Sequence, residues 1–319
     1  MRTDKHWKDI FSKIILDADV IFEILDARNP LGTRNEMLED FLERNAPDKQ
    51  LFLVLNKIDL IPRSVLKKWM RYFEENDDNI EMPIFGVSAR YNRNIIHFKQ
   101  ELKKILSHGD YKAIIVGYPN TGKSSLIQAL AEDRKQVSIS SKAGHTRGVT
   151  EFKLGGGLRL YDSPGVIPLS EKDEVDQALK AIITPEKVED KELVVYRLIE
   201  LYITPRKILE HFEIDESFIF DSLLDREAED FIRKYFEKET KTNKQRLSRK
   251  IRIASSAHRK RSVKTHLPYS DFEKIIELIG RKREMLKKGN EVDQNRVHVT
   301  IIHAWQKNQI KFFILPPER

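Results

Sequence analysis

The feature that most constrains this chain is the glycine-rich segment 117–124, which reads Gly-Tyr-Pro-Asn-Thr-Gly-Lys-Ser. It matches the phosphate-loop pattern, which connects a strand to a helix. The apolar run 113–116 before it predicts a buried strand, and residues 125–130 after it predict a helix. The backbone N–H groups of such a loop and the N-terminus of the helix bind phosphate oxygens. The segment therefore predicts an α/β domain that binds a nucleotide.

Individual residues of this loop have predicted roles. Gly122 allows the backbone to approach the phosphates closely. Lys123 is expected to pair with the β- and γ-phosphates, and the Ser124 hydroxyl is expected to bind Mg²⁺. The nucleotide-binding residues predicted in this segment are Asn120, Thr121, Gly122, Lys123, Ser124 and Ser125.

A second apolar run, residues 51–55, predicts a strand that ends in the pattern N-K-x-D. The carboxylate of Asp59 can accept hydrogen bonds from the ring N–H and the exocyclic amine of guanine, a donor pair that adenine lacks. Asn56 is expected to contact the carbonyl edge of guanine, and the stem of Lys57 to lie over the base. The pattern predicts selectivity for GTP and GDP.

Another element that is expected to contact the guanine base follows the strand predicted at 83–87. A serine, an alanine and a basic residue after a strand are typical of GTPases, where their backbone N–H groups face the guanine oxygen. The residues that we predict for this role are Ser88, Ala89 and Arg90.

The segment after the phosphate-loop helix holds the predicted γ-phosphate sensors. Thr146 is the candidate switch threonine that closes on Mg²⁺, and Thr150 is the alternative. Strands at 149–154 and 158–161 are expected to form a hairpin that runs into Asp162. In the D-x-x-G pattern, Asp162 would hold the water shell of Mg²⁺, and the N–H of Gly165 would face the γ-phosphate.

These elements occur in a permuted order, because N-K-x-D and S-A-R precede the phosphate loop. In a doubly wound sheet, all such loops lie at the carboxyl edge of the strands, so a circular permutation preserves the site. We therefore expect a mostly parallel, circularly permuted GTPase domain over 1–175 and a mainly helical domain over 176–319. The segment after Gly165 continues directly into the second domain, so nucleotide state could bias that domain.

The chain resembles circularly permuted GTPases of the YlqF/RbgA type, including their nucleolar and archaeal relatives. The resemblance rests on D-A-R-N-P (26–30), N-K-I-D, S-A-R, the phosphate loop and D-S-P-G-V, and it extends to the tail 297–317. It implies GTP hydrolysis coupled to maturation of the large ribosomal subunit, and binding of ribosomal RNA.

The hydrolytic machinery is less complete than the binding machinery. Val166 stands where Ras-like enzymes place a water-orienting glutamine. Asn120 matches the asparagine that coordinates K⁺ in potassium-activated GTPases, or it is an ordinary turn residue. We expect slow intrinsic hydrolysis that is faster on the ribosomal particle. The predicted catalytic residues are Asn120, Lys123, Thr146 and Gly165.

Two other functions remain open at this point. The chain could be a nucleotide-gated RNA-binding scaffold with negligible hydrolysis, which Val166 favours, or a GTPase that acts on tRNA.

Positive charge concentrates in residues 241–266, which hold ten Lys or Arg and no Asp or Glu. Since the whole chain has a net charge of +7, the remainder is net acidic. A run of this kind binds phosphates by counterion release, so we expect it to contact the RNA of a large-subunit precursor. The surrounding insertion, 213–266, departs from the nucleolar-type pattern, and its fold is left open.

The remaining features indicate a soluble intracellular protein. The chain has no cysteine, no N-terminal apolar signal and no apolar run of membrane-spanning length. We expect a monomer in the cytoplasm, or in the nucleolus of a eukaryote. Helices are predicted over 271–288 and 293–306, with Trp305 and Phe312–Phe313 in the core. The histidines His298 and His303 are expected to be structural.

Overall fold

The computed structural model describes most of the chain, as two units that are treated separately below. The first unit spans 1–172 and the second 173–319. The described residues are 15–76, 84–106, 109–131, 150–155, 158–162, 173–223, 225–236 and 267–317.

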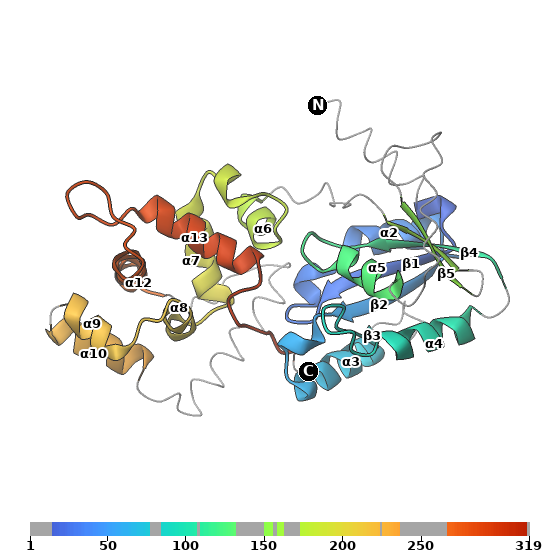
Figure 1. Cartoon of the computed structure of the whole chain (residues 1–319), viewed down its shortest axis with the longest axis horizontal. Coiled ribbons are helices and arrows are strands. Elements are labelled where there is room, and N and C mark those ends of the chain that lie inside the picture. Colours follow the sequence, from blue (N-terminus) through green and yellow to red (C-terminus); the bar gives the residue numbers. More distant parts are fainter. Residues whose placement is uncertain are drawn as a thin grey trace. The chain divides into compact units, whose positions relative to one another are not determined.

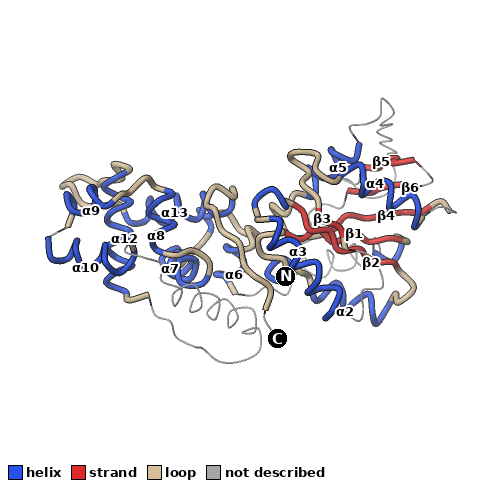
Figure 2. Tube along the Cα trace, turned by 90° about the horizontal axis from the view of Figure 1, so that it is seen from below, coloured by secondary structure: helices blue, strands red, loops and turns tan. Residues whose placement is uncertain are grey.

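A six-stranded sheet in the order β3-β2-β1-β4-β6-β5 organises the first unit. Five strands are parallel, and β5 pairs antiparallel with β6 as the predicted hairpin. Figure 2 shows the strands side by side. The predicted α/β class with a mostly parallel sheet is therefore confirmed. The strands are β1 (Val20–Asp26), β2 (Gln50–Asn56), β3 (Phe85–Gly86), β4 (Tyr111–Val116), β5 (Thr150–Gly155) and β6 (Leu158–Asp162).

Helices cover both faces of this sheet, which explains why its central strands are mainly apolar. Alternate residues of β1 point to opposite faces. Val20, Phe22 and Ile24 pack with α4 and α5, while Ile21 packs with α2. Accordingly, α2 and α4 lie on opposite sides of the strands (Figure 1). The helices are α2 (Glu36–Asn45), α3 (Arg63–Asn76), α4 (Ile95–Ile105) and α5 (Lys123–Ala131), with short 3₁₀ turns η1 (Leu31–Thr33) and η2 (Ile58–Leu60).

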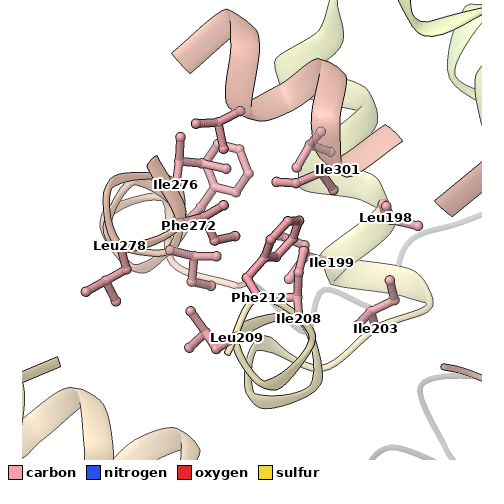
Figure 3. Close-up of a cluster of buried hydrophobic side chains, with 14 of the residues drawn as sticks. Leu198, Ile199, Ile203, Ile208, Leu209, Phe212, Phe272, Ile276, Leu278 and Ile301 are labelled. Atoms are coloured by element: carbon pink, nitrogen blue, oxygen red, sulfur yellow. The ribbon is translucent and has the colours of Figure 1, made fainter. Parts of the chain in front are cut away.

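The second unit is helical in the residues that the structure describes. Aspartate or threonine N-caps begin several of its helices, with Thr204 followed by proline at the first helical position. Its core gathers aliphatic side chains around Phe212 and Phe272 (Figure 3). The elements are α6 (Glu174–Leu179), η3 (Pro185–Lys187), α7 (Lys191–Leu201), α8 (Pro205–His211), α9 (Glu216–Ser222), α10 (Asp225–Tyr235), α12 (Tyr269–Lys282) and α13 (Gln294–Gln306).

The C-terminal tail packs into this core as predicted for two of its three aromatic residues. Trp305 stacks on Phe312 with ring centroids 4.2 Å apart, and its indole N–H donates to the carbonyl of Leu179 at 2.8 Å. Phe313 was predicted to be core, but it is only partly buried, with the Lys207 ammonium 5.8 Å from its ring centroid.

The helix predicted over 271–288 is too long, because α12 ends at Lys282. The following Lys-Lys-Gly-Asn segment favours a turn, and Gly289 adopts a left-handed φ of 100°. Leu286 and Val292 form an isolated antiparallel bridge across this turn. α12 itself ends earlier, because Glu284 adopts a left-handed φ of 53° and the N–H of Met285 donates to the carbonyl of Gly280 at 2.8 Å.

Part of the predicted insertion is helical, since α9 and α10 cover 216–222 and 225–235. The basic run 241–266 lies outside the described residues. Within the described part of the chain, no helix has both the length and the apolar character needed to span a bilayer.

The sheet packing makes a testable prediction on α4. Phe98 is 1% exposed, and its ring lies 4.7 Å from that of Phe85 and 5.8 Å from that of Phe22. Phe98→Ala should lower the free energy of unfolding by about 3–5 kcal/mol, because a buried aromatic is replaced by a cavity. Urea unfolding followed by circular dichroism measures the change.

Ile96→Ala on the same helix is the matched control. Ile96 is 65% exposed, so its truncation should change the unfolding free energy by less than about 0.5 kcal/mol. Equal losses for the two variants would contradict the described packing of α4.

Candidate functional site

The predicted site residues gather at the carboxyl edge of the sheet because of the strand register. Asp26 and Asn56, the last residues of β1 and β2, pair with each other. Asp162, the last residue of β6, pairs with Ile115 near the end of β4. The phosphate loop begins at Gly117, directly after β4. Motifs that are distant in sequence are therefore brought to one edge.

Asn56 joins three of these loops through one buried amide. Its side chain is 2% exposed. Its Nδ2 donates to the carbonyl of Thr121 at 2.9 Å, and its Oδ1 accepts from the N–H of Ala89 at 3.1 Å. In the structure Asn56 and the Ala89 N–H bond to each other, and their predicted contacts with guanine stay predictions. The amide therefore ties the N-K-x-D loop to the phosphate loop and to the S-A-R loop.

Both glycines of the phosphate loop are required by close packing as well as by φ. Gly122 has a φ of 94°, and a Cβ there would lie 2.3 Å from the Nδ2 of Asn56. Gly117 has a φ of 143°, and a Cβ there would lie 2.6 Å from the carbonyl oxygen of Ile24. Any other residue would therefore displace Asn56 or β1 from the loop.

An ion cluster at the end of β1 holds the same edge together. The carboxylate of Asp26 accepts from Arg28 Nε at 2.9 Å and from Lys57 Nζ at 2.8 Å. Lys57 Nζ also donates to the backbone carbonyl of Asn120 in the phosphate loop. Lys57 itself adopts a left-handed φ of 65°. The D-A-R segment thus connects the guanine-side and phosphate-side loops.

The protonation states of this cluster follow from burial and from the paired charges. Burial acts to raise the pKa of Asp26, but the Arg28 hydrogen bond and the Lys57 charge outweigh it and lower the pKa to about 2. Burial lowers the pKa of Lys57, and the Asp26 carboxylate offsets only part of that effect. Asp26 is therefore ionised at neutral pH.

Glu23, three residues earlier in β1, shows the opposite behaviour. It is fully buried, and burial raises its pKa well above the usual range, with the Glu39 carboxylate adding to the effect. Its Oε1 accepts from the backbone N–H of Asn35, the N-cap residue of α2. Glu23 thus anchors the start of α2 as a buried carboxyl group whose pKa lies above its ordinary value.

The carboxylate of Asp59, which is predicted to recognise guanine, is held by the S-A-R loop. Asp59 lies in η2, and its Oδ1 accepts a hydrogen bond from the hydroxyl of Ser88 at 2.5 Å. Ser88 is fully buried, whereas Asp59 is only partly buried. The serine thus fixes the carboxylate and leaves part of it accessible to a base. Arg90, the last residue of this element, is exposed.

Lys123 lies inside the phosphate loop. Its Nζ donates to the carbonyls of Gly117 and Tyr118, each at 2.8 Å. Thr121 closes the loop by donating its hydroxyl to Tyr118 O at 2.9 Å. Ser124 and Ser125 are exposed in the first turn of α5, where a Mg²⁺–nucleotide could reach them.

Several predicted residues cannot be placed. Thr146 and Gly165 lie outside the described residues, as does Val166, while Thr150 and Asp162 are described only as the backbone ends of β5 and β6. Among the described residues, no group of three or more His, Asp or Glu could hold a metal ion. The roles assigned to these positions therefore stay predictions.

Sequence reasoning missed the roles of Asp26 and Arg28, although it quoted the D-A-R-N-P segment. The available signal was an aspartate at the end of a fully buried, mainly apolar strand. A buried carboxylate requires a cation or several hydrogen bonds, and Arg28 lies only two residues away.

The Asp26 cluster predicts a measurable pH dependence of stability. Because the folded-state pKa is about 2 and the unfolded value is about 4, the ion pairs contribute about 3 kcal/mol above pH 4 and lose it as the pH falls toward 2. Asp26→Asn should lower the unfolding free energy by roughly 3 kcal/mol at pH 7, since it removes the carboxylate that pairs with the buried Arg28 and Lys57 cations. It should also flatten the acid limb of a plot of unfolding free energy against pH.

The matched control is Asp48→Asn, because the Asp48 side chain is 77% exposed and lies 3.8 Å from Lys49. That variant should follow the wild-type pH curve. An unchanged acid limb in Asp26→Asn would contradict the ionised cluster.

Comparison with known proteins agrees with this arrangement. The family model for RsgA GTPases matches residues 14–170, and the model for 50S ribosome-binding GTPases matches residues 112–234. A solved structure of YlqF from Thermotoga maritima shares the fold, with a TM-score of 0.54 and 20% identity over 100% of this chain and 99% of that one.

Curated relatives extend the likeness along the whole sequence. An uncharacterized GTP-binding protein of Methanocaldococcus jannaschii is 33% identical over 96% of this chain and 66% of its own length. Nucleolar GTP-binding protein 2 of Saccharomyces cerevisiae is 26% identical over 98% of this chain and 54% of its own length. The chain thus spans between half and two thirds of these relatives. With the motif order and the sheet described above, these matches show that the chain belongs to the circularly permuted GTPases of the YlqF/RbgA type.

Proposed function

We propose that the chain binds GTP and hydrolyses it to GDP, and that it couples this cycle to assembly of the large ribosomal subunit. The observation that carries the nucleotide proposal is the Asn56 amide, which brings N-K-x-D, the phosphate loop and S-A-R to one edge. These are the loops that a guanine nucleotide needs, on its base side and on its phosphate side.

The ribosomal part of the proposal rests on the relatives. Their family descriptions and names include 50S ribosome-binding GTPases and nucleolar GTP-binding protein 2. The basic run 241–266 supplies the charge for contact with ribosomal RNA. A monomer in the cytoplasm, or in the nucleolus of a eukaryote, would fit such a role.

The residues at the sheet edge fit a magnesium nucleotide. Ser124 is exposed at the first turn of α5, and Asp162 ends the strand beside β4, so both approach the mouth of the phosphate loop. In our proposal they hold the ion, with Thr146 or Thr150 closing the site. When bound, Mg²⁺ would neutralise charge on the β- and γ-phosphates.

The chain's own residues would bind and orient the substrate. Asp59, fixed by Ser88, accepts hydrogen bonds from the guanine N–H groups. The Lys123 ammonium, held at the loop mouth by two carbonyls, meets the phosphates there. Asn56 and Lys57 keep the base-side and phosphate-side loops in register rather than reading the base directly.

Hydrolysis by the isolated chain would be slow, since Val166 cannot orient water by hydrogen bonding. We propose that Asn120 contributes to a K⁺ site beside the phosphates. Asn120 is exposed and adopts a left-handed φ of 60°, and Lys57 Nζ contacts its backbone carbonyl, so the loop holds this residue at the site mouth.

The guanine assignment predicts that Asp59→Ala weakens GDP binding by about 100-fold, because two hydrogen bonds to a charged acceptor are lost. Inosine diphosphate lacks the exocyclic amine, so the variant should lose most of the wild-type preference for GDP over inosine diphosphate. Isothermal titration calorimetry with both ligands measures this.

Asp110→Ala serves as control, because Asp110 is exposed just before β4 begins, at the opposite edge of the sheet. Its GDP affinity should match the wild type. Unchanged GDP affinity in Asp59→Ala, or tighter binding of ADP than GDP by the wild type, would refute the assignment.

The potassium proposal predicts faster single-turnover GTP hydrolysis in K⁺ than in Na⁺, with a large-subunit precursor raising the rate further. Asn120→Gly should bring the K⁺ to Na⁺ rate ratio close to one. Glycine tolerates the φ of 60° at this position, so the variant removes the side chain without backbone strain.

Asn120→Asp, which keeps an oxygen ligand, should retain a ratio above one. A wild type that hydrolyses GTP equally well in both salts would exclude the K⁺ site. No hydrolysis in any condition, with GTP still bound, would favour the nucleotide-gated scaffold. Stimulation by tRNA alone would favour the tRNA-directed enzyme.

A further inference from the structure

We propose that the loop 88–94 of the GTPase unit is a second RNA-contact site, at which Tyr91 stacks on a base of single-stranded RNA. The proposal rests on the RNA-directed function above, but it concerns a different part of the chain from the basic run 241–266. It is carried by the build of the loop, by the chemistry of its tip and by the charge of its surroundings.

The loop is closed by backbone hydrogen bonds. Ser88 and Arg93 exchange N–H to O=C bonds, each at 3.1 Å, and so form an isolated antiparallel bridge. The Asn94 side chain donates to the carbonyl of Gly86 at 2.8 Å. Asn92 and Asn94 both adopt left-handed φ values, of 51° and 61°. The loop is therefore preorganised, which lowers the entropy cost of binding at its tip.

The tip presents an aromatic ring between two guanidinium groups. Tyr91 is 57% exposed. The guanidinium carbon of Arg90 lies 5.5 Å from the centroid of its ring, and that of Arg93 lies 5.8 Å from it. A ring with flanking arginines is the combination that stacks on unpaired bases while it neutralises the adjacent phosphates.

The surrounding sequence favours a polyanion. From Ile84 to Gln100 there is no aspartate or glutamate, while Arg90, Arg93 and Lys99 are basic. An acidic protein surface could pair with the three basic residues, but carboxylates would not stack on the exposed ring of Tyr91. Duplex RNA would not do so either, because its bases are already stacked. Single-stranded RNA uses both features, so we assign that class of ligand.

The base of the loop faces the nucleotide site, while the tip is exposed. The Ser88 hydroxyl holds Asp59, and the Ala89 N–H bonds to Asn56. A guanine nucleotide at the base and RNA at the tip would therefore share one short closed loop. Any effect of one ligand on the affinity for the other must be reciprocal.

The test measures binding of a fluorescein-labelled 12-nucleotide oligouridylate to the full GDP-bound chain by anisotropy. Tyr91→Ala should weaken binding about tenfold, as expected for the loss of one stacked base. Tyr91→Phe should bind within about twofold of the wild type, because phenylalanine still stacks. A 12-base-pair RNA duplex should bind all three proteins alike.

Two charge variants complete the design. Arg93→Gln should weaken oligouridylate binding more than Lys68→Gln, which removes an exposed lysine from α3 of the same unit. Oligouridylate affinity that is independent of Tyr91, or an equal loss for the duplex, would overturn the inference. GDP affinity is measured on the same samples, because only the proposed function predicts GDP binding. Normal GDP affinity with oligouridylate binding that does not depend on Tyr91 would refute the RNA-contact site alone, whereas absent GDP binding would refute the proposed function.

Discussion

The structure of the candidate site depends on one buried amide. Asn56 donates to the phosphate loop and accepts from the S-A-R loop, and it lies where β2 ends. A buried amide without partners is costly, so its bonds hold the three loops together as a unit. Gly122 is needed because any side chain there would occupy the space of this amide. The site thus rests on contacts within the protein as well as on those to a ligand.

This dependence explains how the fold tolerates a permuted chain. In the parallel register, the last residues of β1 and β2 pair with each other. The phosphate loop begins after β4, which pairs with β1 on its other side. The Asp26–Lys57 ion pair then links this edge to the carbonyl of Asn120. None of these contacts requires a particular order of motifs along the chain. What the order does change is that the segment following D-x-x-G continues into the second unit.

Sequence patterns predicted the strands and the phosphate loop well, because each of these elements has one strong local pattern. Apolar runs located the strands, and the strand-loop-helix context located the phosphate loop. The hydrogen bonds of Asn56 to Thr121 and Ala89 were not predicted, because the N-K-x-D pattern indicates only a contact to the base, and the loop contacts depend on the packing. The Arg28–Asp26 pair depends on the turn that follows β1, which propensities do not specify. The end of α12 was missed because the residues after Lys282 continue the helical pattern, and a glutamate at 284 gives no signal for the left-handed φ that ends the helix.

The most direct measurement is a crystal structure of the chain with a non-hydrolysable GTP analogue and Mg²⁺. The account predicts the guanine ring N–H and amine within about 3.2 Å of the Asp59 carboxylate oxygens. It also predicts that Lys123 Nζ contacts the β- and γ-phosphates while Asn56 keeps its bonds to Thr121 and Ala89. A base bound away from Asp59, or an Asn56 amide released from both loops, would contradict it.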